Sequence, residues 1–349
     1  MIRSPQRLGA ALGLAAAALF GLSAPLSKLL LEQVSVQLLA GLLYLGGAFG
    51  LIAYRLVRRG STEAPLRSAD LPALGGVVLL GGIVGPLLML FGLQRVTAAT
   101  GSLLLNLEAP FTMLLAVLVF REHLGRYGAA AAALIVLGAV LLKMRPGNAG
   151  ADTIGVLAIA GACLCWAVDN NLTQRLSSKD PFTIARYKTL VAGTFNVVLA
   201  MALGAGLPRA TILIWAVVVG SLSYGVSIVL DSYALRLIGA ARESAYFATA
   251  PFVGAVAALV LLGERPAAVD ALGMLAMAAG VVLMIRERHS HWHRHEAMEH
   301  EHAHIHDDHH RHDHGPGIPP GEPHSHLHRH EEQEHEHPHV PDVHHRHKH

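Results

Sequence analysis

Glu108 is the residue whose type and surroundings point most directly to chemistry. It lies in a long apolar run, two residues after Asn106 and two before Pro110. A charge at the centre of a membrane-spanning helix costs about 2.5–3.5 kcal/mol on insertion scales, and Pro110 removes a backbone donor and favours a kink. We predict that Glu108, with Asn106, faces a central cavity and binds a substrate or a proton. The alternative is a protonated Glu108 hydrogen-bonded between helices.

A second polar set lies in the apolar run 152–174. Trp166, Asp169, Asn170 and Thr173 are spaced at i, i+3, i+4 and i+7, which places them on one face of a helix. This face is expected to line a cavity, with an aromatic lid and several oxygen ligands. The alternative is the end of a helix that is wetted by the cytoplasm.

Charged residues also interrupt the next two apolar runs. Arg186 and Lys188 lie in the run 181–204, and Asp231 lies in the run 209–235. A pair between Arg186 and either Asp169 or Asp231 would lower the cost of burying these charges. Such a pair is either structural or a gate that opens when substrate enters. The predicted substrate-binding set is therefore Glu108, Asn106, Trp166, Asp169, Asn170, Thr173, Arg186 and Asp231.

Other charged residues lie at the ends of apolar runs. Lys28 can extend its ammonium group to the membrane interface, and Glu122 and Glu264 are expected to anchor loops. The sequence contains no nucleophile–base set and no phosphate-binding loop, so we expect no enzyme and no ATP-driven pump.

Histidine is concentrated at the C-terminus. Of 24 histidines, all except His123 fall within residues 289–349, where Pro, Gly, Glu and Asp separate them and no apolar periodicity exists. This composition predicts a disordered tail. Neutral imidazole is a ligand for Zn, Ni and Co, so we predict weak, multiple metal binding and no other cofactor. The alternative is incidental binding. The predicted ligands fall in three groups, mostly at every second position: His289, His291, His293, His295, then His300, His302, His304, His306, then His309, His310, His312 and His314.

The elements that must position these groups are apolar runs of about 20 residues, the length of a transmembrane helix. The mean hydropathy is +0.43 and 15% of the residues are charged. The net charge of +2 gives no reason to expect nucleic acid. The expected partners are the lipid bilayer, a small-molecule or ion substrate and transition-metal ions, and a homodimer stays open. The predicted spans are 8–31, 36–56, 70–94, 97–120, 124–143, 152–174, 181–204, 209–235, 239–263 and 267–286.

One stretch of the sequence occurs twice. Ala109-Pro110-Phe111 returns as Ala250-Pro251-Phe252, and Glu122 returns as Glu264 at nearly the same distance. We therefore predict a duplicated unit, with units at 8–143 and 152–286 and a tail at 289–349. Because each unit has five spans, the second enters the membrane inverted, a common plan for secondary transporters.

The distribution of Lys and Arg predicts the orientation. If the N-terminus is cytoplasmic, most Lys and Arg lie at the inner ends of the spans. Examples are Arg55, Arg58, Arg59 and Arg67. The positive-inside rule then places both termini in the cytoplasm, in a multi-pass protein of the inner membrane.

The ten spans, the duplication and the Ala-Pro…Glu signature near the ends of the fourth and ninth spans resemble the drug/metabolite transporter superfamily, specifically EamA-type permeases. The resemblance covers about residues 8–286 and implies an all-α membrane bundle that moves a small metabolite by alternating access. The histidine tail lies outside the usual family pattern.

Three functions remain open from the sequence. The first is a metabolite exporter with a metal-binding cytoplasmic tail. The second is an efflux carrier for a divalent metal such as Ni, Co or Zn. The oxygen ligands that the spans offer favour it, at Glu108, Asp169, Asn170 and Asp231. The lack of histidine in the spans argues against it. The third is a membrane-anchored metal store.

Overall fold

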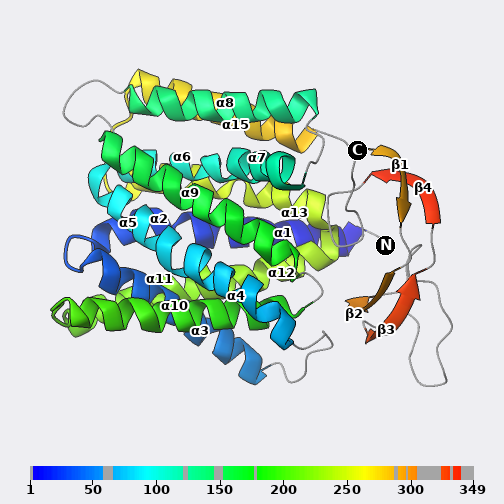
Figure 1. The fold of residues 1–349 in the computed structure, drawn as a ribbon. Helices are drawn as coiled ribbons and strands as arrows, with labels where there is room; N and C mark the ends of the chain where they lie inside the picture. The colour runs from blue at the N-terminus through cyan, green and yellow to red at the C-terminus, as the bar shows by residue number, and fades with distance from the viewer. Residues whose placement is uncertain are drawn as a thin grey trace.

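The computed structural model describes residues 3–57, 66–120, 125–144, 152–176, 179–286, 290–295, 298–304, 324–330 and 333–338. Its membrane part is a bundle of helices that lie roughly along one common direction (Figure 1). The α-helices are α1 (Arg3–Gly21), α2 (Ser23–Leu30), α3 (Val36–Val57), α4 (Leu71–Gly76), α5 (Gly85–Arg95), α6 (Ala98–Leu104), α7 (Glu108–Phe120), α8 (Arg126–Lys143), α9 (Thr153–Gln174), α10 (Pro181–Ala202), α11 (Ala210–Gly220), α12 (Ser227–Ile238), α13 (Ala240–Phe247), α14 (Ala250–Leu261) and α15 (Ala268–Arg286). The 3-10 turns are η1 (Ser68–Asp70) and η3 (Leu105–Leu107), and the π-helical segments are η2 (Val77–Val84) and η4 (Ser221–Val226).

Nine helical segments of the described residues are long and apolar enough to cross a membrane. They match nine of the ten predicted spans. The remaining predicted span is α10, which is a helix of 22 residues. It is less apolar than the others because it contains Arg186 and Lys188.

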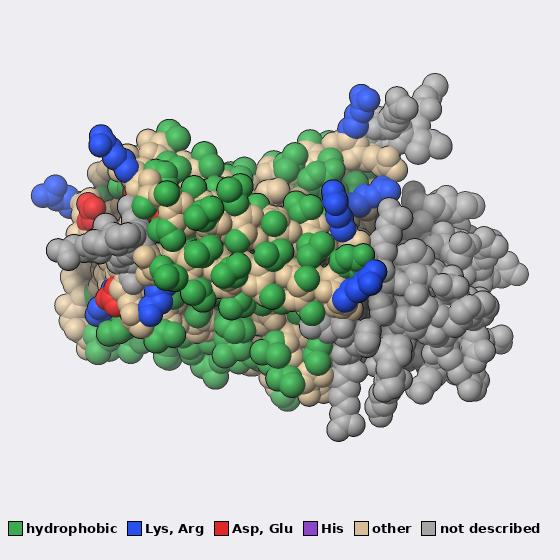
Figure 2. All heavy atoms as spheres, turned by 90° about the horizontal axis from the view of Figure 1, so that it is seen from above, with side chains coloured by type: hydrophobic (Ala, Val, Ile, Leu, Met, Phe, Trp, Pro, Cys, Tyr) green, Lys and Arg blue, Asp and Glu red, His purple; other side chains and the backbone are tan. Residues whose placement is uncertain are grey.

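The surface of the bundle is apolar between two charged ends. Figure 2 shows a broad band of hydrophobic side chains with Lys and Arg gathered at either end. Large apolar side chains that would be buried in a soluble protein are exposed, such as Phe49 at 65%, Leu157 at 65% and Val260 at 75%. Such a contiguous apolar surface is suited to contact with lipid tails.

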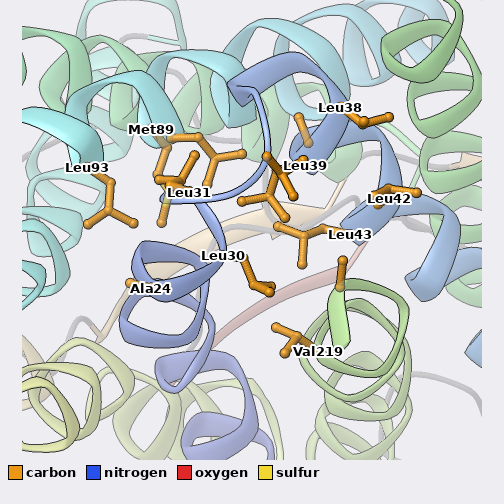
Figure 3. Close-up of a cluster of buried hydrophobic side chains, with 14 of the residues drawn as sticks. Ala24, Leu30, Leu31, Leu38, Leu39, Leu42, Leu43, Met89, Leu93 and Val219 are labelled. Atoms are coloured by element: carbon orange, nitrogen blue, oxygen red, sulfur yellow. The ribbon is translucent and has the colours of Figure 1, made fainter. Parts of the chain in front are cut away.

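Within the bundle, apolar side chains from four helices pack into one cluster. Leu30 and Leu31 at the end of α2 meet Leu38, Leu39, Leu42 and Leu43 of α3, Met89 and Leu93 of α5, and Val219 of α11 (Figure 3). Close approach of backbones complements this packing. At the crossing of α3 and α10, a Cβ on Gly41 would lie 3.0 Å from the Gly193 carbonyl oxygen, so both positions favour glycine.

Two predicted spans are broken at the Ala-Pro-Phe motifs. The span 97–120 changes from α6 through η3 to α7, just before Pro110. The span 239–263 ends α13 at Phe247 and begins α14 at Ala250, just before Pro251. Proline has no backbone N–H, which removes one helical hydrogen bond in each span. The α-helix is thus interrupted just before Pro110, where the sequence predicted a kink, and a similar break occurs at the second motif.

Corresponding helices of the two halves of the sequence pack in matching ways. The helix α3 lies along α10, and α8 lies along α15. The first span of each half also packs against the third span of the other half, as α1 packs against α12 and α9 packs against α5. The π-helical segments η2 and η4 also occupy corresponding spans.

The turn between α5 and α6 is held by residues from distant parts of the chain. Lys28 Nζ donates hydrogen bonds to the carbonyl oxygens of Leu93 at 2.5 Å and Val96 at 2.8 Å. The Glu264 carboxylate accepts the N–H groups of Ala98 at 2.6 Å and Ala99 at 2.9 Å, at the start of α6. The Lys28 ammonium thus binds the end of one helix and the Glu264 carboxylate the start of the next, the arrangement that the helix dipoles favour. Glu264 was expected to anchor a loop, and its carboxylate binds the first residues of α6. Glu122 lies outside the described residues.

The same end of the bundle carries an exposed ion pair. Arg95 donates to an oxygen of Asp152 at 2.9 Å, and the other oxygen of Asp152 accepts the N–H of Ile154 at the start of α9. The hydrogen bond from Arg95 and that from the backbone hold the pKa of Asp152 below its ordinary value.

The tail differs from the prediction of a disordered segment. Its described residues form four strands, β1 (Ser290–His295), β2 (Met298–His304), β3 (His324–His330) and β4 (Gln333–Pro338). They pair antiparallel as β1 with β4 and β2 with β3, beside the end of the bundle where α1 begins and α15 ends (Figure 1). Backbone pairing needs no apolar core, and the alternating histidines suit the two-residue period of a strand.

Candidate functional site

The candidate site is built around a free carbonyl oxygen in η2. The Gly85 N–H bonds to the Leu80 carbonyl, in the five-residue register of a π-helix. The next donor in this register would be Pro86, which has no N–H, so the Gly81 carbonyl has no helical partner. Two side chains donate to it instead, Tyr44 through its hydroxyl at 2.8 Å and Trp166 through Nε1 at 3.1 Å.

An ion pair lies directly against this segment. Lys188 of α10 donates to a carboxylate oxygen of Asp169 of α9, and Asp169 is buried. The Thr173 hydroxyl makes a longer contact of 3.4 Å to the other oxygen of Asp169. A Cβ on Gly81 would overlap the Asp169 carboxylate and lie 2.7 Å from Lys188 Nζ, so only glycine fits there. Each charge offsets the cost of burying the other.

Glu108 lies beside this ion pair, at the first residue of α7. Asn170 Nδ2 donates to Glu108 Oε1 at 2.7 Å. Asn170 directly follows Asp169 along α9, so this hydrogen bond brings Glu108 near the ion pair. Glu108 is half-buried and Asn170 is exposed, so the pair can be reached from the surface of the protein.

Aromatic rings extend the site toward α1 and α13. The ring of Tyr44 lies 5.5 Å from that of Tyr224, which meets Phe20 edge-on at 5.9 Å. Phe20 in turn lies 5.3 Å from Phe247. These four rings form an apolar wall next to the charged groups. The site can therefore offer a carboxylate, an ammonium group and an apolar surface to one ligand.

The structure brings five of the eight predicted site residues together. Trp166, Asp169, Asn170 and Thr173 lie on one face of α9, as their spacing predicts, and Asn170 connects this face to Glu108. Whether they bind substrate stays a prediction.

The other three predicted residues lie apart from this group. Asn106 is buried and donates to the Leu103 carbonyl at 2.9 Å, because the turn η3 directs it away from Glu108. Asp231 lies on α12, and its Oδ1 is buried without a hydrogen-bond partner among the described residues.

Arg186 does not form the expected ion pair. Its guanidinium lies 5.6 Å from the ring centre of Tyr187, and among the described interactions it pairs with neither Asp169 nor Asp231. Lys188 takes Asp169 instead. Residues two apart on a helix point to widely different directions, so only one of the two cations can face α9.

Sequence reasoning missed several parts of the site. Tyr44, Tyr224 and the Gly81 carbonyl were not singled out, and Lys188 was noted without a role in binding. The position of Gly81, five residues before Pro86, was a usable signal of a free carbonyl.

The described residues include no group of three or more His, Cys, Asp and Glu that could hold a metal ion. For the predicted tail ligands, His289, His306, His309, His310, His312 and His314 lie outside the described residues. The backbones of His291, His293 and His295 lie in β1, and those of His300, His302 and His304 lie in β2. Metal binding by these side chains stays a prediction.

Comparison with known proteins gives the family. The EamA-like transporter family matches this chain twice, at residues 7–144 and 153–286. An uncharacterized transporter of Methanothermobacter thermautotrophicus is 30% identical over 283 residues, which cover 76% of this chain and 82% of the relative. A probable terminal-alkyne amino-acid exporter of Streptantibioticus cattleyicolor is 27% identical over 222 residues, which cover 63% of this chain and 75% of that protein. A solved crystal structure has a similar fold, with a TM-score of 0.60 and 19% identity, and the match covers 79% of this chain and 96% of that one. The chain is a multi-pass membrane protein that belongs to the EamA-like transporter family.

Proposed function

We propose that this chain is a secondary transporter that exports a small zwitterionic solute of the amino-acid type. The observation that carries the proposal is the grouping of Glu108, Lys188 and an aromatic wall at one place among apolar helices. A free amino acid has an ammonium group, a carboxylate and a side chain, which complement these three features. The relative named as an amino-acid exporter supports the same substrate class.

In this proposal each charged end of the solute has one partner. Its ammonium group binds Glu108, with Asn170 holding the Glu108 carboxylate in place. Its carboxylate binds Lys188 and competes with Asp169 for the ammonium group of that lysine. Entry of the solute therefore weakens the contact between α9 and α10, and this change is the link between binding and movement. Trp166 and Thr173 complete the wall on α9.

We propose alternating access between two inverted units as the mechanism. The paired contacts of α3 with α10 and of α8 with α15 support a two-fold arrangement, as does the double match to the family. The broken helices at Pro110 and Pro251 and the π-helical segments supply points at which a helix can bend. Both termini are proposed to be cytoplasmic, in the cell inner membrane.

The histidine tail is proposed to bind Zn, Ni or Co beside this transporter, on the strength of its alternating histidines alone. Metal efflux is the weaker candidate for the cargo. The only cation near Glu108 and Asp169 among the described residues is Lys188, and its positive charge opposes a bound metal ion.

The experiment compares three solutes of one shape in inverted membrane vesicles. Leucine has both charged ends, isoamylamine lacks the carboxylate, and 4-methylvalerate lacks the ammonium group. A hydrogen bond to a charged group contributes about 1.5–3 kcal/mol, so loss of either end should lower transport at least about tenfold.

Two results would contradict the proposal. Equal transport of the amine and of leucine would remove the role of Lys188, and no transport of any amino acid above that of empty vesicles would remove the substrate class. A Ni or Zn flux in the same vesicles would favour metal efflux.

A further inference from the structure

The turn between α5 and α6 is held by two charged side chains that have no part in the proposed binding site. On one side of the turn, Lys28 Nζ donates three hydrogen bonds, as many as an ammonium group has N–H donors. They reach the carbonyl oxygens of Leu93 at 2.5 Å, Gln94 at 3.2 Å and Val96 at 2.8 Å. Because the last four carbonyls of a helix have no partner within it, Lys28 closes the end of α5.

Glu264 holds the other side of the turn with both of its carboxylate oxygens. Oε1 accepts the N–H of Ala98 at 2.6 Å, and Oε2 accepts that of Ala99 at 2.9 Å. These are the first two residues of α6, whose N–H groups have no partner within the helix. Gly263 lies between α14 and Glu264 with a φ of 64°, a left-handed conformation that favours glycine and ends a helix.

The Glu264 contact joins the two halves of the chain. Glu264 lies in the half that the family matches at 153–286, whereas α6 lies in the half matched at 7–144. Both charged groups bind backbone N–H or carbonyl groups, and hydrogen bonds of this kind can be exchanged for hydrogen bonds to water. The contact is therefore able to hold the two halves together and also able to break when they move apart.

Backbones of the two halves touch at the same end of the bundle. A Cβ on Gly254 of α14 would lie 2.6 Å from the carbonyl oxygen of Gly21, the last residue of α1. A Cβ on Gly92 of α5 would lie 2.6 Å from the carbonyl oxygen of Gly155 on α9. Each of these contacts joins one helix from each half. The bundle is therefore closed where Lys28 and Glu264 hold the turn.

Toward the opposite end, side chains separate the two halves. A Cβ on Gly76 of α4 would meet Cδ1 of Leu172 on α9, and a Cβ on Gly13 of α1 would lie 3.3 Å from the Cβ of Tyr246 on α13. Asn170 of the candidate site lies near this end of α9 and is exposed. The two halves thus lie closer at the α5–α6 turn than they do near the candidate site.

We propose that Lys28 and Glu264 form a gate, which closes the bundle at the α5–α6 turn while the candidate site is open toward the opposite end. When their hydrogen bonds break, α5 and α6 separate from α2 and α14, and the site opens at the turn instead. The gate itself rests on the contacts of Lys28 and Glu264. The alternation of the two ends rests on the proposed transport function.

Labelling of single cysteines by a membrane-impermeant thiosulfonate, in right-side-out and inverted vesicles, tests the gate. Cys163 and Cys165 are first replaced by Ala. Ser102 lies one turn after Ala98 on α6, is 1% exposed, and its hydroxyl has no hydrogen-bond partner among the described residues. Ser102→Cys therefore reports opening at the gate, and Asn170→Cys reports access to the candidate site from the opposite end.

Loss of the Lys28 ammonium group should change the two labelling rates in opposite directions. Lys28→Met should raise the labelling rate of Ser102→Cys at least fivefold from the side of the gate and should lower that of Asn170→Cys at least twofold from the other side. Glu264→Gln keeps its shape but loses one of two acceptor oxygens, so both rates should change in the same directions by smaller factors.

A matched control is Arg95→Met, which breaks the exposed ion pair with Asp152 at the same end of the bundle. Both labelling rates should change less than twofold in this variant, because exposed ion pairs contribute little.

Two results would overturn the gate. One is an unchanged labelling rate of Ser102→Cys in folded Lys28→Met and Glu264→Gln. The other is faster labelling of both cysteines, which would show a loosened bundle and not a change in the end that is open. Faster labelling of Ser102→Cys with an unchanged rate at Asn170→Cys would support the gate and refute the alternating access of the proposed function.

Discussion

The ion pair between Lys188 and Asp169 allows a quantitative prediction. Among the described residues, replacing Lys188 by Met leaves the buried Asp169 carboxylate with only the 3.4 Å contact from Thr173. Removal of one partner from a buried pair costs about 3–5 kcal/mol. Because the Lys188 side chain is 21% exposed and that of Asp169 is 6% exposed, we expect the lower end, about 3 kcal/mol in the free energy of unfolding.

The double variant Asp169→Asn with Lys188→Met is expected to be more stable than the sum of the two single effects predicts. Neutral residues at both positions leave no uncompensated charge, so the interaction between the two sites should be at least about 2 kcal/mol. Unfolding by sodium dodecyl sulfate in mixed micelles, followed by tryptophan fluorescence, measures all three variants.

A matched control is the pair of Arg55 and Asp180, at 3.6 Å, in which Arg55 is 42% exposed. Arg55→Met should cost less than about 1 kcal/mol, since exposed pairs contribute little. The reasoning fails if Lys188→Met costs no more than Arg55→Met, or if the two replacements at Lys188 and Asp169 simply add.

Three further predictions concern other parts of the chain. Gly81→Ala places a methyl group on the Asp169 carboxylate and should lower leucine transport in proteoliposomes at least tenfold, whereas Gly75→Ala, with open space around it, should leave the rate unchanged. Glu264→Ala removes a carboxylate cap and should cost about 1 kcal/mol in the unfolding assay, and an unchanged free energy would show that the cap is not stabilising. Deletion of residues 289–349 should leave the bundle folded and remove most of the Zn binding that calorimetry measures at neutral pH. In the full chain, Zn binding should collapse near pH 5, because imidazole has an ordinary pKa of about 6.5 and protons compete with the metal. Equal Zn binding at both pH values would exclude the histidines as ligands.

The helical bundle follows from local features of the sequence. Apolar length gives the spans, since a helix must be about 20 residues long to cross a bilayer. The break at Pro110 follows from its missing N–H, and the face of α9 follows from a spacing of three and four residues. Each of these inferences needs only neighbouring residues.

The partners within the site could not be predicted in the same way. Whether Arg186 or Lys188 reaches Asp169 depends on the rotation of α10 about its own axis, which packing against α3 and η2 fixes. The contact of Tyr44 with Gly81 depends on a π-helical register that shifts every later residue of the span. Strand pairing in the tail was missed because alternating histidines carry no apolar signal.

The most direct test of the account is the leucine transport rate of Glu108→Gln in proteoliposomes, with equal amounts of folded protein in the membrane. The glutamine keeps the shape and the hydrogen bond with Asn170 but removes the charge that would hold the ammonium group of the solute. We predict a loss of at least tenfold relative to the wild type. An undiminished rate would show that Glu108 has a structural role only and would contradict the proposed binding site.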